Sequence, residues 1–107
     1  MATQEYRWPI NLQLDAVRVI CLRYGVAQLA LFGSVLREDF GPDSDIDVLC
    51  KLRADSPVTT LLDWIHLKHA LEDLWDRPVD LVEPHLLHPL IRDEIFAVER
   101  LIYGAPQ

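Results

Sequence analysis

The chain has 107 residues, of which half are apolar and a quarter are charged, a composition typical of one soluble globular domain spanning residues 1–107. Its formal net charge of −7 argues against direct binding to nucleic acid or to an anionic membrane, because both need an excess of Lys and Arg. A nucleotide is not excluded by this charge, since carboxylates can hold its phosphates through metal ions.

The first predicted element in chain order is an amphipathic helix over residues 10–24, where apolar side chains recur every three or four positions. Pro9 suits the first turn of this helix and Gly25 its C-terminal cap. The apolar run 26–32 predicts a buried strand that stops at Gly33. A short helical turn and a loop broken by a Gly-Pro pair are expected to follow.

Residues 45–52 predict a second strand, and a long helix is expected after it. Ser56 is predicted to be the N-cap of this helix, with Pro57 at its first position. The helix should end before Pro78. Its predicted apolar face consists of Leu61, Trp64, Leu67, Leu71 and Leu74.

The last part of the chain predicts one more strand and one more helix. Residues 79–82 have the sequence VDLV and predict a third strand. Pro89 is expected to open a last helix that continues through residues 91–103 and ends at Gly104. The predicted fold class is α/β (α+β), a sandwich of helices on a small sheet.

Three acidic residues in predicted strands are the candidate catalytic and metal-binding residues. Asp45 and Asp47 point to the same face of their strand, about 7 Å apart by the rise of ~3.3 Å per residue. Asp80 is a lone acid in an otherwise apolar strand and joins them if the two strands are neighbours. Such acids repel one another unless cations neutralise them. All-oxygen ligands favour Mg²⁺ or Mn²⁺, and we expect two Mg²⁺ ions.

The Gly33-Ser34 pair lies where a strand is followed by a helical turn and forms a candidate phosphate site. Glycine lets the backbone approach a ligand closely, and the amides and hydroxyl at the start of the turn can donate hydrogen bonds to phosphate oxygens. Arg37, one turn later, can add a charged contact. A phosphate site opposite a two-metal acidic cluster is suited to in-line nucleotidyl transfer from a nucleoside triphosphate such as ATP.

The segment LFGSVLREDFGPDSDIDVLC resembles the signature of minimal nucleotidyltransferase domains of the DNA polymerase β superfamily: Gly-Ser, ten residues, Asp-x-Asp and a later strand Asp. The resemblance extends over nearly the whole chain and implies the nucleotidyltransferase fold, in which a small mixed β-sheet packs against helices. It implies that Gly33 and Ser34 bind the nucleotide phosphates and that Asp45 and Asp47 bind metal. Asp80 would be the third metal ligand and a possible base.

Short, acidic members of this family without a substrate-binding domain resemble antitoxins whose partner is a HEPN-type ribonuclease toxin. That resemblance implies transfer of AMP from ATP to a tyrosine of the toxin, with the exposed sides of the terminal helices as the partner surface. Glu38 stands where many members carry glycine, and its charge is expected to weaken triphosphate binding. Two alternatives stay open: transfer to a small molecule such as an aminoglycoside, and a binding-only antitoxin with a vestigial site.

Other motif interpretations are weaker. An EF-hand beginning at Asp43 lacks the required Gly and Glu, and no Walker or Rossmann glycine pattern is present. The pairs His66/His69 and His85/His88 have no third ligand at metal-binding spacing and predict solvated surfaces, while Trp8 is compatible with either packing or a partner contact. Cys21 and Cys50 lie in apolar surroundings, which predicts reduced thiols. The first segment has no apolar signal core, which predicts a cytoplasmic protein.

Overall fold

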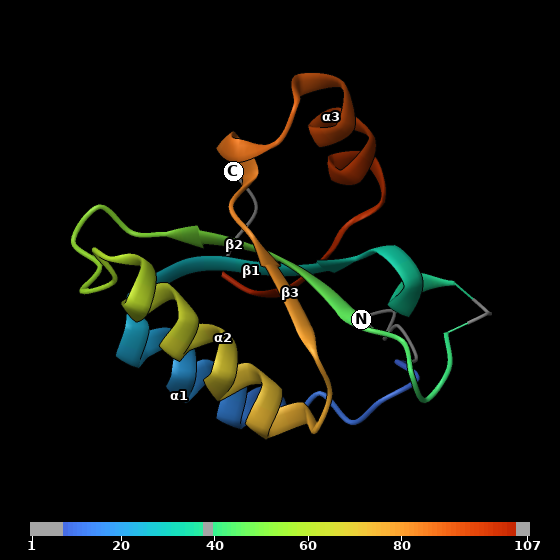
Figure 1. The fold of residues 1–107 in the computed structure, drawn as a ribbon, viewed down its shortest axis with the longest axis horizontal. Coiled ribbons are helices and arrows are strands. Elements are labelled where there is room, and N and C mark those ends of the chain that lie inside the picture. The colour runs from blue at the N-terminus through green and yellow to red at the C-terminus, as the bar shows by residue number, and fades with distance from the viewer. Residues whose placement is uncertain (1–7, 38–39, 105–107) are drawn as a thin grey trace, which may run out of the picture.

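The computed structural model describes residues 8–37 and 40–104, in which four strands form one mixed sheet (Figure 1). The strands are β1 (Val26–Phe32), β2 (Ile46–Leu52), β3 (Val79–Val82) and β4 (Arg100–Tyr103), in the order β3-β2-β1-β4. β2 and β3 are parallel, whereas β1 is antiparallel to both β2 and β4. The predicted fold class, a small mixed sheet packed against helices, is confirmed.

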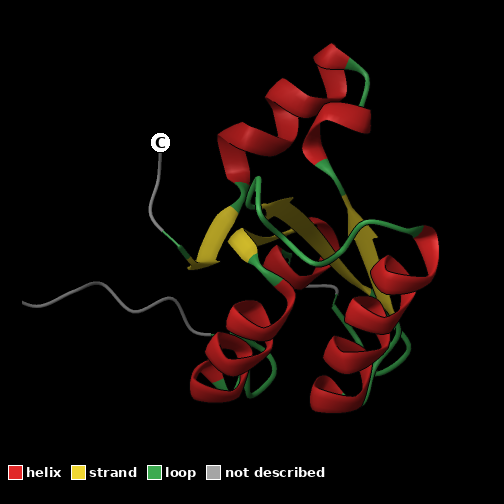
Figure 2. Cartoon of the chain, turned by 90° about the vertical axis from the view of Figure 1, so that its left-hand side faces the viewer, coloured by secondary structure: helices red, strands yellow, loops and turns green. Residues whose placement is uncertain are grey.

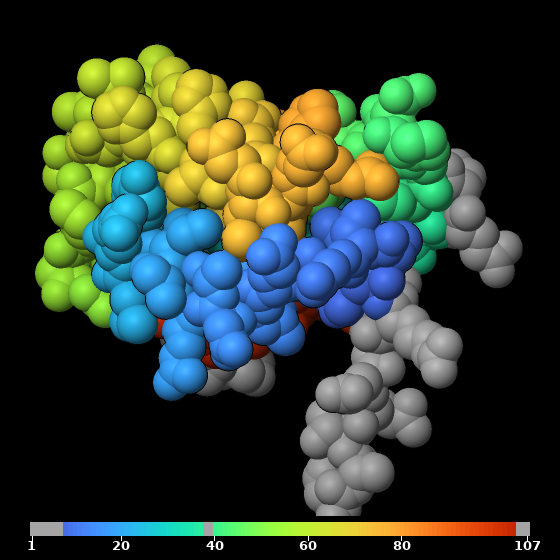
Figure 3. All heavy atoms as spheres, turned by 90° about the horizontal axis from the view of Figure 1, so that it is seen from below, coloured from blue at the N-terminus to red at the C-terminus, as the bar shows by residue number. Residues whose placement is uncertain are grey.

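Two helices cover one face of this sheet, α1 (Leu14–Tyr24) and α2 (Leu61–Trp75) (Figures 1 and 2). They lie side by side, as the view onto this face shows (Figure 3). The third helix, α3 (Pro89–Val98), lies on the other side of the sheet and contains no buried residue. The core therefore lies between the sheet and α1 and α2, and its largest fully buried side chains are Leu29, Leu31, Ile46, Leu67 and Leu71.

Helix α1 is shorter at its start than the apolar spacing predicts, and the prediction that it begins at residue 10 with Pro9 in the first turn is wrong. Gln13, directly before α1, has a left-handed backbone (φ 52°), and its side-chain amide donates to the carbonyl of Leu74 at 2.8 Å. The Trp75 indole donates to the carbonyl of Leu12 at 2.9 Å. The preceding segment is thus bound to the end of α2 instead of continuing the helix. The predicted C-cap, Gly25, is confirmed by its φ of 67°.

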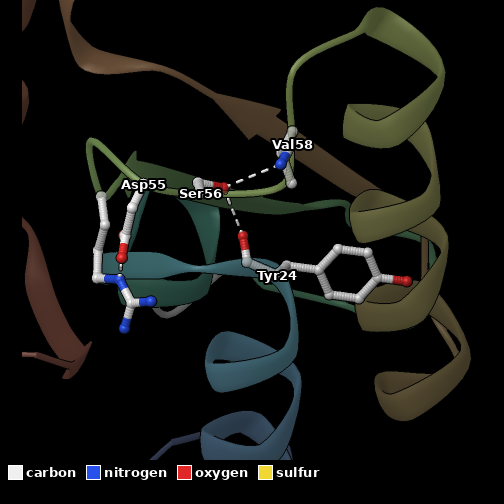
Figure 4. Close-up of polar contacts among 5 residues, drawn as sticks. Tyr24, Asp55, Ser56 and Val58 are labelled. Carbon is white, nitrogen blue, oxygen red and sulfur yellow. Dashed lines mark hydrogen bonds and ion pairs between the residues drawn. The ribbon is translucent and has the colours of Figure 1, made fainter.

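Helix α2 begins at Leu61 and not at Pro57 as predicted. Its N-cap is Thr60, which forms a capping box with Asp63: the Asp63 N–H donates to the Thr60 hydroxyl at 3.1 Å, and the Thr60 N–H donates to the Asp63 carboxylate at 3.2 Å. Ser56, the predicted N-cap, instead donates to the carbonyl of Tyr24 at 2.7 Å and accepts from the Val58 N–H at 3.1 Å (Figure 4). The buried side chains of α2 are Leu67, Leu71 and Trp75, whereas Leu61 is exposed.

The last predicted helix is also too long, because residues 100–103 form β4 and not a helical continuation. Their pairing with β1 satisfies backbone groups at an edge of β1 that would otherwise be unpaired. Ile102 and Tyr103 pack against the hydrophobic core from this strand. The sequence RLIY is compatible with both structures, and the free edge of β1 favours the strand.

The two cysteines lie in the core, whereas His85 and His88 make local contacts near the start of α3. Cys21 and Cys50 are buried, as predicted. The imidazole of His85 contacts the Glu83 carboxylate at 2.6 Å, and His88 accepts from the Leu90 N–H at 3.2 Å. Across residues 8–37 and 40–104, no helix has the length and apolar character needed to cross a bilayer.

Candidate active site

The parallel pairing of β2 and β3 places two of the predicted acidic residues side by side. Asp47 and Asp80 are register partners across these strands. Their chain neighbours Ile46, Val48 and Val79 are buried against the helices, so both carboxylates point to the opposite face of the sheet. The third predicted strand therefore lies beside the second, as the prediction for Asp80 requires.

The pKa of Asp47 is raised by its partial burial and by the negative charges beside it. Partial burial contributes most to this rise in pKa, followed by the negative charge of Asp80, with a smaller contribution from Asp45. A hydrogen bond from the backbone N–H of Ser34 and the positive charge of Arg37 act in the opposite direction. A carboxylate in these surroundings favours a nearby cation or a proton, because either one relieves the repulsion.

Asp45 lies directly before β2 and is more exposed than Asp47. Its carbonyl oxygen accepts a hydrogen bond from the Ser34 hydroxyl at 3.2 Å. Within the described parts of the chain, no three Asp, Glu, His or Cys side chains are grouped so that they could hold a metal ion. The structure therefore shows a pair of acids in register and a third acid two residues before Asp47, and joint metal binding by all three stays a prediction.

Gly33 packs directly against the carboxylate of Asp47. Its φ is 75°, a backbone conformation that residues with a side chain rarely adopt. A Cβ atom at this position would overlap the Asp47 carboxylate oxygen. The glycine of the predicted Gly-Ser motif is therefore required for the acid to pack against this turn.

The turn after β1 is a 3₁₀ helix, η1 (Gly33–Leu36), and both donors of its Ser34 are directed to β2. The hydroxyl of Ser34 bonds to the Asp45 carbonyl and its N–H to the Asp47 carboxylate. Arg37 follows η1, and its N–H donates to the Ser34 carbonyl at 2.9 Å. These three predicted phosphate-binding residues thus border the acidic pair. Glu38 lies outside the described residues.

A pocket of about 470 Å³ opens on the same face of the sheet, between the strands and α3. Leu49 and Lys51, two and four residues after Asp47 on β2, line its floor, and Phe96 and Glu99 line its opposite side. Burial raises the pKa of Glu99. Sequence reasoning missed this pocket, because it depends on β4 and on the position of α3, neither of which local periodicity predicts.

The family model for nucleotidyltransferase domains matches residues 14–102, most of the chain and all of the site described above. This chain belongs to the nucleotidyltransferase domain family. The domain is 36% identical over 76 residues to a Methanocaldococcus jannaschii protein provisionally named a protein adenylyltransferase, a match covering 71% of this chain and 78% of that protein.

Solved structures show the same fold. A minimal nucleotidyltransferase superimposes on the domain with a TM-score of 0.68 at 36% identity, covering 81% of this chain and 86% of the other. A chain of the complex between a tri-AMPylated Shewanella oneidensis HEPN toxin and an MNT antitoxin gives a TM-score of 0.55 at 23% identity. This second match covers 89% of the domain and 74% of the other chain, and at that identity it shows the fold alone.

Proposed function

We propose that this nucleotidyltransferase domain transfers AMP from ATP to a hydroxyl group of a protein partner. The observation that carries the proposal is the register pair Asp47 and Asp80 on the face of the sheet opposite α1 and α2, with Gly33 packed against Asp47. The relative named as a protein adenylyltransferase supports protein as the acceptor class. The structural neighbour in a complex with an AMPylated HEPN toxin supports a HEPN-type toxin as partner, with a tyrosine as the proposed acceptor.

The chemistry of the acidic side chains suits Mg²⁺, although the described structure does not group all three around one metal position. Asp45, Asp47 and Asp80 offer only carboxylate oxygens, the ligands that this ion prefers, and a cation beside Asp47 would relieve the repulsion from Asp80 that contributes to its raised pKa. We propose that these three acids hold two Mg²⁺ ions together with the ATP phosphates. The ions, when bound, neutralise the triphosphate and lower the pKa of the attacking hydroxyl.

The residues of the domain would act on ATP as follows. The acceptor oxygen attacks the α-phosphorus, the bond from that phosphorus to the bridging oxygen of the β-phosphate breaks, and pyrophosphate leaves. Asp80 is exposed at the sheet face and is the proposed acceptor of the hydroxyl proton. Gly33 would allow the phosphates to approach the backbone, and Arg37 would supply donors to the phosphate oxygens. Ser34 would do the same after exchanging its bonds to the Asp45 carbonyl and the Asp47 carboxylate for bonds to phosphate.

The exposed apolar side chains of the terminal helices suit a protein partner. On α1 and α3 they are Leu14, Val19, Leu22, Leu90, Ile91, Phe96 and Val98, each about half exposed or more. These residues form two separate surfaces, because α1 and α3 lie on opposite sides of the sheet (Figure 1). Exposed apolar surface of this kind is typical of protein contact sites. A bound partner would bring its own hydroxyl to the acidic pair, so the domain needs no second domain to hold an acceptor.

The proposal is tested by incubating the full chain with labelled ATP, Mg²⁺ and a purified HEPN-type toxin. We expect label and the mass of one or more AMP groups on the toxin. The Asp45→Asn/Asp47→Asn double variant should lose at least about 100-fold in rate, because preorganised charge in an active site commonly contributes that much. Asp73→Asn, which removes an exposed acid on α2, is the matched control and should leave the rate unchanged.

The same experiment separates the alternatives. A chain that neutralises the toxin without labelling it, and does so equally well as the double Asn variant, would be a binding-only antitoxin. Label on an aminoglycoside but not on the toxin would replace the protein acceptor by a small molecule. Either result would overturn the proposed protein acceptor.

A further inference from the structure

Arg77 connects the two segments that carry the acidic residues, although it was not a predicted site residue. It lies between α2 and β3, three residues before Asp80. We infer that Arg77 is a positioning residue for the proposed AMP transfer: it holds the loop 40–44, and with it Asp45, against the start of β3. This inference rests on the proposed function, but the contacts of Arg77 can be tested without it.

The Arg77 guanidinium makes three contacts with the loop. Its Nη1 donates to the carbonyl of Gly41 at 2.8 Å and to the carbonyl of Ser44 at 3.3 Å. Its central carbon lies 4.5 Å from the centre of the Phe40 ring, a cation–π distance. A planar guanidinium can stack on the ring and donate in its own plane at the same time, which a lysine ammonium cannot do.

The loop is closed on itself, so that holding it at Arg77 also fixes its last residue. The Ser44 N–H donates to the Gly41 carbonyl at 3.1 Å, and the Ser44 hydroxyl accepts from the Gly41 N–H at 3.0 Å. Asp45 follows Ser44 directly. The position of the Asp45 backbone, whose carbonyl binds Ser34, therefore depends on the loop that Arg77 holds.

β3 has an anchor of its own that does not use the Arg77 side chain. The Glu72 carboxylate on α2 accepts from the Val79 N–H at 2.9 Å, and the Ile46 N–H donates to the Pro78 carbonyl at 3.0 Å. The start of β3 and its pairing with β2 are thus secured by other groups. Replacing Arg77 should free the loop while Asp80 and the sheet stay in place.

We expect that freeing the loop lowers the catalytic rate while the domain stays folded. Acidic ligands act on a shared cation only when they are held at fixed positions, and a displacement of about 1 Å can cost on the order of 100-fold in rate. The described contacts of the Arg77 side chain are with the loop 40–44, so its proposed effect passes through Asp45. It is therefore a positioning residue, and its removal should lower kcat more than it raises KM for ATP.

The first experiment compares Arg77→Lys and Arg77→Ala with Arg53→Lys. Arg53 is an exposed arginine whose side chain contacts Asp55 of its own loop at 2.9 Å, and it serves as the matched control. We expect kcat for AMP transfer to fall about tenfold in Arg77→Lys, the effect of losing one hydrogen bond to a charged group, and further in Arg77→Ala. Added guanidinium ion should restore part of the activity of Arg77→Ala and none of Asp45→Asn/Asp47→Asn.

A structural role alone would give a different result. If the activity of the Arg77 variants falls only in proportion to their folded fraction, or if guanidinium restores nothing, Arg77 does not position the site. Phe40→Leu removes the stacking contact while keeping an apolar side chain against the core, and should lower the activity about two- to fivefold.

The second experiment needs no enzymatic activity and measures amide hydrogen exchange by NMR. In Arg77→Lys we expect exchange of the Ser44 N–H to accelerate at least about tenfold, with the Val79 N–H unchanged. Unchanged exchange at Ser44 would overturn the inference even in an active enzyme. If the wild-type chain transfers no AMP while Ser44 exchange does accelerate, the proposed function has failed and the loop contact is real.

Discussion

Asp47 is the residue in which the conflict between stability and function is clearest. Burial and the charge of Asp80 raise its pKa above the ordinary 3.8, so the folded protein binds this proton more tightly than the unfolded chain does. The stability that the proton contributes is complete at pH below 3.8 and is lost as the pH rises through the raised pKa. At neutral pH the ionised carboxylate therefore lowers the free energy of unfolding.

This sign leads to a prediction for Asp47→Asn. At pH 7 the variant should unfold at a higher temperature than the wild type, with a gain below about 1 kcal/mol because the carboxylate is partly solvated. The amide oxygen of Asn can still accept the Ser34 N–H. The gain should shrink as the pH approaches 3.8, which thermal unfolding followed by circular dichroism at several pH values would measure. A lower midpoint at pH 7 would contradict the electrostatic interpretation, and Asp73→Asn is the control.

At the scale of elements, the start of α2 shows how capping chemistry selects between two possible first residues. Ser56-Pro57 and Thr60 with Asp63 both have the residue types of a helix start. The Ser56 hydroxyl is bound to the carbonyl of Tyr24 at the end of α1, so it does not cap α2 (Figure 4). Thr60 forms two reciprocal hydrogen bonds with Asp63. Hydrogen bonds to the Asp63 carboxylate from Thr59 and Thr60 lower the pKa of that carboxyl.

We therefore predict that Thr60→Ala lowers the free energy of unfolding by about 1 kcal/mol through loss of the N-cap, whereas Thr60→Ser keeps it. Urea unfolding of the two variants beside the wild type measures the difference. Equal stability of Thr60→Ala and Thr60→Ser would show that the capping box contributes nothing. Helical content should fall only in the alanine variant.

At the scale of the whole molecule, stability is concentrated in one layer of contacts. The sheet buries one face against α1 and α2, while α3 on the other side has no buried residue (Figure 2). The opposite face is thus left open for the acidic pair and for the pocket beneath α3. A fold with one packed face and one functional face separates the residues that stabilise it from those proposed to react.

This separation predicts unequal effects of two leucine truncations. Leu71 is 0% exposed between α2 and the sheet, so Leu71→Ala should cost about 2–5 kcal/mol. Leu90 on α3 is 71% exposed, so Leu90→Ala should change the free energy of unfolding by less than about 0.5 kcal/mol. Chemical denaturation with urea measures both values. Similar losses in the two variants would show that α3 is part of the cooperative core.

Local sequence patterns were enough to place the strands at 26–32, 45–52 and 79–82 to within a residue, because short apolar runs between turn residues have few alternatives. The sequence also predicts Gly33 and the three acids as site residues, since these residue types occur at a spacing that ordinary packing does not require. Only the tertiary structure decided where α1 and α2 begin, that 100–103 pairs with β1, and that Asp80 lies opposite Asp47. Those outcomes depend on hydrogen bonds between segments far apart in the chain, such as Trp75 to Leu12 and Arg77 to Gly41, which no local pattern encodes.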